Sequence, residues 1–258
     1  MNILEKIVKD KELEVEERAK IVPLERIKDS QRLFSVRDFE GQLKKNTIQV
    51  IAEIKRRSPS SGEININASP SLIAKSYVDN GAACISVLTD ENYFGGQLHF
   101  IQEVKSVVGV PILRKDFIIS DYQVWESFHA GADAILLMAD IVDPLILMDL
   151  YDLATDLGLH VLFEVHDRKN FKLFDKIRPR IIGVNCRDFK TMDTDINLFE
   201  EKILELPRNS ILVAESGISS MEDLKFVFGL GFSAALVGTH LMVSADPGSA
   251  LASLLRGR

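Results

Sequence analysis

Ionisable and amide side chains interrupt or end the short apolar runs of this sequence, at six positions: Glu53, Lys55, Lys115, Glu164, Asn185 and Glu215. One charged residue at the end of an apolar run usually lies on a solvated rim. Six of them favour a functional cluster instead, because burying an unpaired carboxylate costs several kcal/mol. Lysines beside the glutamates offset that cost and place acids next to bases. The residue types therefore predict general acid-base chemistry, if the fold gathers them.

Small residues follow the last two apolar runs, as Ser216-Gly217 and Gly238-Thr239. Each pair alone is equally typical of an ordinary tight turn. In (β/α)8 barrels, however, the loops after the seventh and eighth strands commonly bind phosphate through backbone N–H groups. Both pairs together favour a phosphate site.

A long connection covers residues 56–69 and contains Ser58, Pro59, Ser60 and Gly62. Loops of this length in compact domains are usually functional or mobile. We expect it either to close over the site as a lid or to be an ordinary solvated loop.

Eight apolar runs alternate with longer amphipathic segments from residue 48 onward: IQVIAEI, CISVLT, VPILR, DAILLM, HVLFEV, RIIGVN, SILVAE and AALVG. Such alternation predicts parallel strands with crossover helices. Ser69-Pro70, Asp143-Pro144 and Asp246-Pro247 predict helix starts. Gly131 and Gly158 are 27 residues apart and predict helix ends, at the spacing of a compact βα unit.

Eight βα units over residues 48–258 predict an α/β fold, the (β/α)8 barrel, in which strand ends meet at one mouth. The alternative is an open doubly wound sheet. A dinucleotide-binding sheet needs a glycine-rich turn after its first strand, where this sequence has KRRSPSSG. The similar string from Gly229 to Ala234 falls between a helix and a strand, so the barrel is favoured.

Residues 1–47 precede the repeat and predict an N-terminal helical extension within one domain of residues 1–258. Ile3, Ile7 and Val8 recur at helical spacing, and a second short helix is expected over residues 35–44. We expect these helices to close the bottom or rim of the barrel and to add an apolar wall to the site.

The composition restricts the partners. The 258 residues carry a formal net charge of −7, which argues against nucleic-acid or anionic-membrane partners and leaves a small-molecule or protein partner open. Neither a signal peptide nor a membrane span is predicted. The two cysteines, Cys84 and Cys186, suggest no disulfide framework, and the five histidines have no ligand spacing, so we expect a cytoplasmic protein without a metal.

Several longer strings are specific enough to indicate a family. They are NILEKIV, VIAEIKRRSPSSG, ISVLTDENYFGGQL, PILRKDFIISDYQVWES, GADAILLM, LGLHVLFEVHD, IGVNCRDFKT, VAESGIS and ALVGTHLM. In this order they resemble indole-3-glycerol phosphate synthase of tryptophan biosynthesis, over nearly the whole chain. Ser61 stands where that family usually has lysine, and Cys186 where asparagine or serine is more familiar.

The resemblance implies a carboxy-lyase that needs no cofactor. Its substrate is 1-(o-carboxyphenylamino)-1-deoxyribulose 5-phosphate, which undergoes ring closure, decarboxylation and dehydration to indole-3-glycerol phosphate.

The resemblance also implies roles for individual residues. Lys115 is the expected acid and Glu164 the expected base, with Glu53 and Lys55 sharing the dehydration. The other expected contacts are Asn185, Arg187, Glu215 and Ser216 for the substrate body, Ser58, Gly217, Gly238 and Thr239 for the phosphate, and Phe94, Phe117 and Leu136 for the anthranilate ring.

Other functions fit the residues less closely. Lys55 or Lys115 could form a Schiff base, as in a sugar-phosphate aldolase. A phosphoribosylanthranilate isomerase would need fewer ionisable groups than are present. A non-catalytic phosphate sensor would not need Glu53, Lys115 and Glu164 together.

Overall fold

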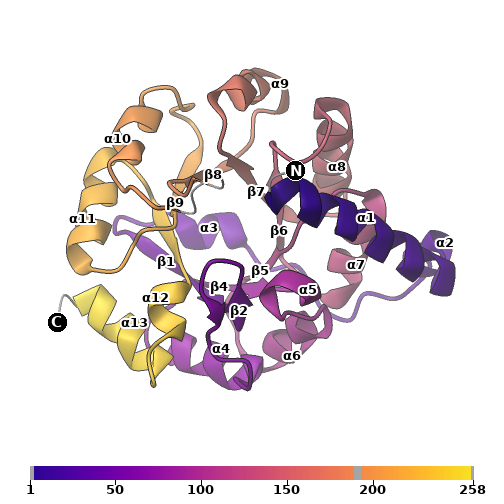
Figure 1. Ribbon diagram of the computed structural model, residues 1–258, viewed down its shortest axis with the longest axis horizontal. Helices are drawn as coiled ribbons and strands as arrows, with labels where there is room; N and C mark the ends of the chain where they lie inside the picture. Colours follow the sequence, from indigo (N-terminus) through magenta and orange to yellow (C-terminus); the bar gives the residue numbers. More distant parts are fainter. Residues whose placement is uncertain (1–2, 189–192, 257–258) are drawn as a thin grey trace.

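The computed structural model describes residues 3–188 and 193–256, in which eight parallel strands form a closed barrel (Figure 1). The strands are β1 (Gln49–Ile54), β4 (Cys84–Leu88), β5 (Ile112–Lys115), β6 (Ala134–Met138), β7 (His160–Val165), β8 (Ile181–Asn185), β9 (Ile211–Glu215) and β10 (Ala234–Val237). Each coincides with a predicted apolar run.

The first and last strands of the barrel complete the ring. β1 pairs with β10 through Gln49 and Ala234, and with β4 through Ile51 and Cys84. The (β/α)8 prediction is therefore confirmed and the open sheet was wrong. Closure leaves none of the eight strands as an unpaired edge.

Helices surround the barrel. The longer ones are α4 (Pro70–Asp79), α6 (His99–Val107), α7 (Asp121–Ala130), α8 (Pro144–Asp156), α11 (Met221–Leu230) and α13 (Pro247–Arg256). Short ones are α5 (Glu91–Phe94), the 3-10 helix η1 (Arg168–Leu173), α9 (Phe174–Ile177), α10 (Leu198–Ile203) and α12 (Thr239–Met242). The three predicted proline starts are confirmed. Gly131 ends α7 with φ of 96°, a conformation that glycine adopts without strain. None of the helices in the described residues is long and apolar enough to cross a membrane.

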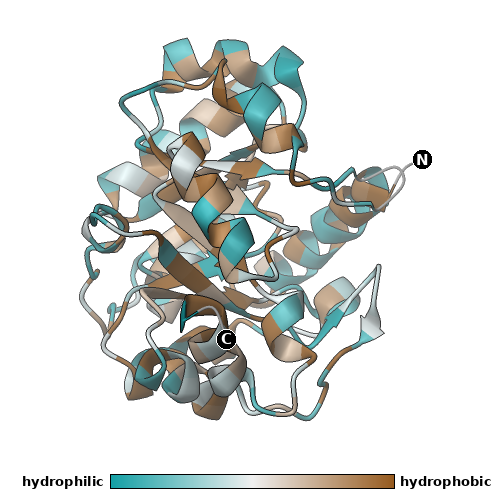
Figure 2. Cartoon of the chain, turned by 90° about the vertical axis from the view of Figure 1, so that its left-hand side faces the viewer, coloured by the Kyte–Doolittle hydropathy of each residue, from teal (hydrophilic) through white to brown (hydrophobic). Residues whose placement is uncertain are grey.

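The core has two layers. One lies inside the barrel and includes Ile51, Leu113, Leu162 and Val213, all nearly inaccessible to solvent. The other lies between the strands and the helices, and Figure 2 shows the hydrophobic strands in the middle of the molecule. This packing fixes the strand ends that carry the polar residues.

The extension contains three helices, α1 (Ile3–Ile21), α2 (Leu24–Lys28) and α3 (Phe39–Leu43). α3 buries Phe39 and Leu43 against the interior layer, and Phe39 lies 6.4 Å from the His160 ring at the start of β7. It therefore closes the bottom of the barrel. The prediction of a helix over residues 35–44 was too long, because Asp38 caps the helix by accepting a hydrogen bond from Gly41 N–H.

The first helix lies across the other end of the barrel (Figure 1). Lys11 of α1 is almost completely buried, with its ammonium 2.9 Å from an oxygen of Asp90 and 3.1 Å from one of Asp116. Asp90 follows β4 and Asp116 follows β5. A buried lysine between two carboxylates ties the extension to the loops at the C-terminal ends of these strands.

Residues 56–69 contain a small hairpin of β2 (Arg57–Ser58) and β3 (Gly62–Glu63). Gly62, the first residue of β3, has φ of 65°, a conformation that glycine adopts without strain where the chain leaves the turn. The connection is therefore partly ordered by backbone pairing, and its tip reaches the functional site described next.

Candidate active site

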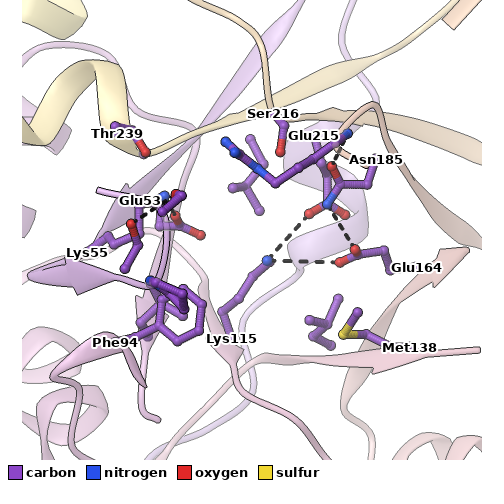
Figure 3. A pocket seen from close by; sticks show the side chains of 18 of the residues that line it. Glu53, Lys55, Phe94, Lys115, Met138, Glu164, Asn185, Glu215, Ser216 and Thr239 are labelled. Carbon is purple, nitrogen blue, oxygen red and sulfur yellow. Dashed lines mark hydrogen bonds and ion pairs between the residues drawn. The ribbon is translucent and has the colours of Figure 1, made fainter. Parts of the chain in front are cut away.

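One cavity at the C-terminal ends of the strands contains every predicted site residue (Figure 3). These residues are Glu53, Lys55, Ser58, Phe94, Lys115, Phe117, Leu136, Glu164, Asn185, Arg187, Glu215, Ser216, Gly217, Gly238 and Thr239. They come from strands far apart in the sequence, and the parallel barrel brings them together because all its strands end at the same mouth.

Lys115 occupies the middle of the acid-base cluster. Its Nζ lies 3.6 Å from Oε2 of Glu215 and 3.9 Å from Oε2 of Glu164 (Figure 3). Asn185 donates a 3.0 Å hydrogen bond from Nδ2 to Oε1 of Glu164. An ammonium is therefore held between two carboxylates, one of which is fixed by an amide from the adjacent strand.

A second ion pair lies across the same cavity. Lys55 Nζ is 3.1 Å from Oε1 of Glu53, and the Ser86 hydroxyl of β4 is 3.5 Å from the other oxygen. Gly238 leaves space for this carboxylate, because a Cβ at that position would lie 2.3 Å from Glu53 Oε1. The turn after β10 therefore depends on a residue without a side chain.

Burial and neighbouring charges act in opposite directions on these groups. Burial alone would lower the pKa of Lys115, but Glu215 and Glu164 outweigh it and raise the pKa above its usual value. Burial, reinforced by Glu164, raises the pKa of Glu215 despite Lys115. Burial would also raise the pKa of Glu53, but Lys55 and Lys115 reverse the effect and lower it. The cluster therefore favours the charged forms of Lys115 and Glu53 and the protonated form of Glu215.

The small residues gather on the opposite side of the cavity from Phe94 and Met138 (Figure 3). Ser216 has φ of 71° and Gly217 of 74°, so the chain turns sharply after β9. A positive φ at a serine is uncommon, and such residues cluster at functional sites. The Ser58 hydroxyl faces the same cavity and accepts a 3.1 Å hydrogen bond from the backbone N–H of Ser61.

Apolar side chains form the remaining wall. The rings of Phe94 and Phe117 are 6.1 Å apart, and Leu136 lies in the same cavity. Residues of α1 complete this wall, which confirms the expected contribution of the extension: Ile3, Leu4 and Ile7. The wall gives a flat aromatic group an environment without competing polar partners.

Some lining residues were not predicted as site residues: Pro59, Ser60, Leu88, Asp116, Met138, Ile218, Leu236, Val237 and His240. Most of these residues directly precede or follow a predicted site residue in the sequence. That proximity was the signal by which they could have been found. Leu88, Met138 and Leu236 are different, because they belong to apolar runs and resemble ordinary core residues until the barrel is closed.

Gly183 of β8 provides a test of how the cluster is positioned. A Cβ there would lie 2.1 Å from Oε1 of Glu215, so Gly183→Ala should push that carboxylate away from Lys115. We expect kcat to fall at least about tenfold with the fold retained, since small displacements in an active site are costly. Gly229→Ala in α11 is the matched control, because its Cβ would meet nothing within 4 Å. Wild-type kcat in Gly183→Ala would show that this placement of Glu215 does not matter.

The fold and the site together define a (β/α)8-barrel enzyme with an acid-base cluster at its mouth, next to turns suited to an anionic group. A family model described as indole-3-glycerol phosphate synthase matches residues 4–254. The chain belongs to this family of carboxy-lyases in tryptophan biosynthesis, which act on a phosphorylated substrate.

Curated relatives support the assignment along the full length. The indole-3-glycerol phosphate synthase of Rhodopirellula baltica is 39% identical over 257 residues, covering 99% of both chains. That of Geobacillus sp. (strain WCH70) is 42% identical over 257 residues, covering 98% of this chain and 97% of the relative. Among solved structures, 3-hexulose-6-phosphate synthase from Salmonella typhimurium has a TM-score of 0.63 at 14% identity, covering 81% of this chain and 99% of its own; this similarity supports the fold.

Proposed function

We propose that this cavity converts 1-(o-carboxyphenylamino)-1-deoxyribulose 5-phosphate to indole-3-glycerol phosphate with Lys115 as the first acid. The observation that carries the proposal is the position of the Lys115 ammonium between Glu164 and Glu215 in a buried site. Its raised pKa keeps the proton in place until a stronger acceptor forms. The developing alkoxide of the substrate is such an acceptor.

Ring closure is the first step. The aromatic carbon that bears the carboxylate attacks the ketone carbon, so a carbon-carbon bond forms and the carbonyl π electrons move to oxygen. Lys115 transfers its proton to that oxygen. A positioned cation also stabilises the negative charge that grows there, which is usually a large part of such catalysis.

Decarboxylation and dehydration then complete the indole. The bond to the carboxylate breaks, carbon dioxide leaves, and its electron pair restores the aromatic ring. The new hydroxyl leaves as water after receiving a second proton, and Glu164 takes the proton of the anilino nitrogen. A proton then moves from the neighbouring methylene carbon to that nitrogen, which gives the aromatic indole. Glu53 and Lys55 share this step, and Glu215, together with Ser216, contacts the substrate hydroxyls. The whole reaction takes up one proton from solvent, because two are delivered and one is returned.

The two sides of the cavity bind the two ends of the substrate. Ser58, Gly217, Gly238 and Thr239 hold the phosphate, and Phe94, Phe117 and Leu136 enclose the anthranilate ring. Asn185 and Arg187 orient the part between them. The β2–β3 hairpin carries Ser58 and acts as the lid of this site. We also infer that the enzyme works in the cytoplasm, where its two buried cysteines stay reduced.

The phosphate assignment predicts competition by inorganic phosphate. Gly238→Glu should raise KM at least about tenfold, since it places a negative charge beside the negatively charged phosphate of the substrate. Any side chain at this position also approaches Glu53, so Gly238→Ala is the matched control for displacement without charge. Initial rates over a range of substrate concentrations give KM for both. Equal KM values in the two variants would place the phosphate elsewhere.

The activity is tested by mixing the protein with the carboxyphenylamino substrate and following the rise of indole fluorescence. Borohydride added during turnover should trap no covalent adduct, because the proposed mechanism contains no Schiff base. Absence of indole would overturn the proposal, and a reduced adduct on Lys55 or Lys115 would favour the aldolase-type mechanism.

A further inference from the structure

A second cavity lies beside the active site, between α1, α10 and the loops that follow β6, β7 and β8. His166 and Asp140 belong to the lining of this cavity and not to that of the first, whereas Arg187 belongs to both. The proposed mechanism uses neither His166 nor Asp140. His166 lies next to Glu164, the proposed base of the reaction, and Asp140 lies next to His166.

His166 connects Glu164 with Asp140. Its Nε2 lies 3.2 Å from Oε1 of Glu164, and its Nδ1 lies 3.4 Å from Oδ2 of Asp140. The other oxygen of Glu164 faces Lys115 at 3.9 Å. The Glu164 carboxylate therefore contacts the acid-base cluster with one oxygen and the imidazole with the other.

Asp140 is held so that it can orient this imidazole. It accepts hydrogen bonds from the backbone N–H groups of His166 at 2.9 Å and Asp167 at 3.2 Å, and from Asn170 Nδ2 at 2.9 Å. Burial would raise the pKa of Asp140, but the hydrogen bonds from His166 and the backbone outweigh it and lower the pKa. An ionised and fixed carboxylate at Nδ1 keeps a proton on that nitrogen, which leaves Nε2 directed at Glu164.

We propose that His166, oriented by Asp140, is a positioning residue that exchanges protons between Glu164 and the second cavity. This inference rests on the proposed role of Glu164 as the base. After the reaction, the protonated Glu164 gives its proton to the Nε2 lone pair, so the carboxylate is restored and an imidazolium forms. The imidazolium then releases a proton to water in the second cavity. With that proton released, the two acids take up two protons from solvent, which gives the net uptake of one proton per turnover.

Charged groups of both signs surround the imidazole. Besides Glu164, which lies outside the second cavity, and Asp140, the charged groups around it line that cavity: Glu5, Lys9 and Glu12 of α1, Asp167 after β7, Lys169 of η1, Arg187 and Asp188 after β8, and Lys202 of α10. Imidazole is the side chain that most commonly relays protons near neutral pH.

The test compares the first turnover with later ones. His166→Gln keeps a hydrogen-bond donor near Glu164 but cannot carry a proton. We expect the first indole per site to form at nearly the wild-type rate, with steady-state turnover slower by about tenfold. KM should stay within about twofold, because His166 does not line the substrate cavity. His99→Gln is the control, since this exposed histidine on α6 pairs only locally with Glu103.

A second variant separates proton transfer from structural support. In His166→Ala, added imidazole should enter the second cavity and restore steady-state turnover. Imidazole methylated on both nitrogens should not restore turnover, because it can neither accept nor release a proton. Wild-type steady-state rates in His166→Gln, or equal slowing of the first and later turnovers without rescue, would overturn the relay. Failure of the wild-type protein to form indole would instead overturn the proposed function itself.

Discussion

Lys115→Met should lower kcat at least about a hundredfold, the usual contribution of one general acid. Methionine keeps much of the lysine volume but has no proton to deliver to the ketone oxygen. Formation of carbon dioxide and of indole should slow equally, because both follow ring closure. The measurement is a quenched time course of both products, and turnover near the wild-type value would remove Lys115 from the acid role.

The same variant should change the pH dependence of stability. In the wild type the pKa of Lys115 is raised in the folded state, so its contribution to stability is complete below the unfolded value and is lost only at strongly alkaline pH. Without the lysine, Glu164 and Glu215 face each other without a cation. Burial and Glu164 already raise the pKa of Glu215, and loss of the Lys115 cation should raise it further. A carboxyl group with a raised pKa in the folded state loses stability as the pH rises, so Tm should fall more steeply with rising pH than in the wild type. Lys45→Met, at an exposed lysine, is the control.

Glu164→Gln should slow indole formation by about a hundredfold while carbon dioxide appears much faster than indole. Glutamine keeps the shape of the side chain and its contact with Asn185, but it cannot accept the anilino proton. Ring closure depends on Lys115, so the steps before dehydration should continue and a decarboxylated intermediate should accumulate.

A rapid-quench experiment distinguishes the two roles. It follows carbon dioxide and indole in Glu164→Gln and in Lys115→Met from the first milliseconds onward. Equal slowing of both products in both variants would contradict separate roles. Such a result would show that Lys115 and Glu164 belong to one coupled network, whose apparent pKa values cannot be assigned to single residues.

The barrel and most of its site could be predicted because the relevant information is local. Each strand is a short apolar run, and Pro70, Pro144 and Pro247 mark helix starts through backbone geometry alone. Once a parallel barrel is inferred, the strand order places Glu53, Lys115 and every other strand-end residue at one mouth. The assignment of residues 1–258 to one domain and the roles of the site residues stay predictions.

Features that depend on distant contacts could not be predicted. Lys11 resembles any lysine of a charged helix, and its burial becomes apparent only when Asp90 and Asp116 are seen beneath α1. A glycine inside a strand, such as Gly183, usually only weakens that strand. Its role becomes clear when the Glu215 carboxylate is seen to occupy the space that a Cβ would take. His166 was set aside because the histidines have no ligand spacing, and its partner Asp140 lies on a different loop.

The pairing of β1 with β10 also has a consequence for synthesis of the protein on the ribosome. Gln49 emerges early, whereas its partner Ala234 is added near the end of translation. At roughly 5–20 residues per second, β1 waits on the order of 10 to 40 s with one edge unpaired. During that time the nascent chain offers exposed backbone N–H and C=O groups to other chains. Ribosome-bound chains that end before residue 234 should therefore bind chaperones more strongly than chains that include β10.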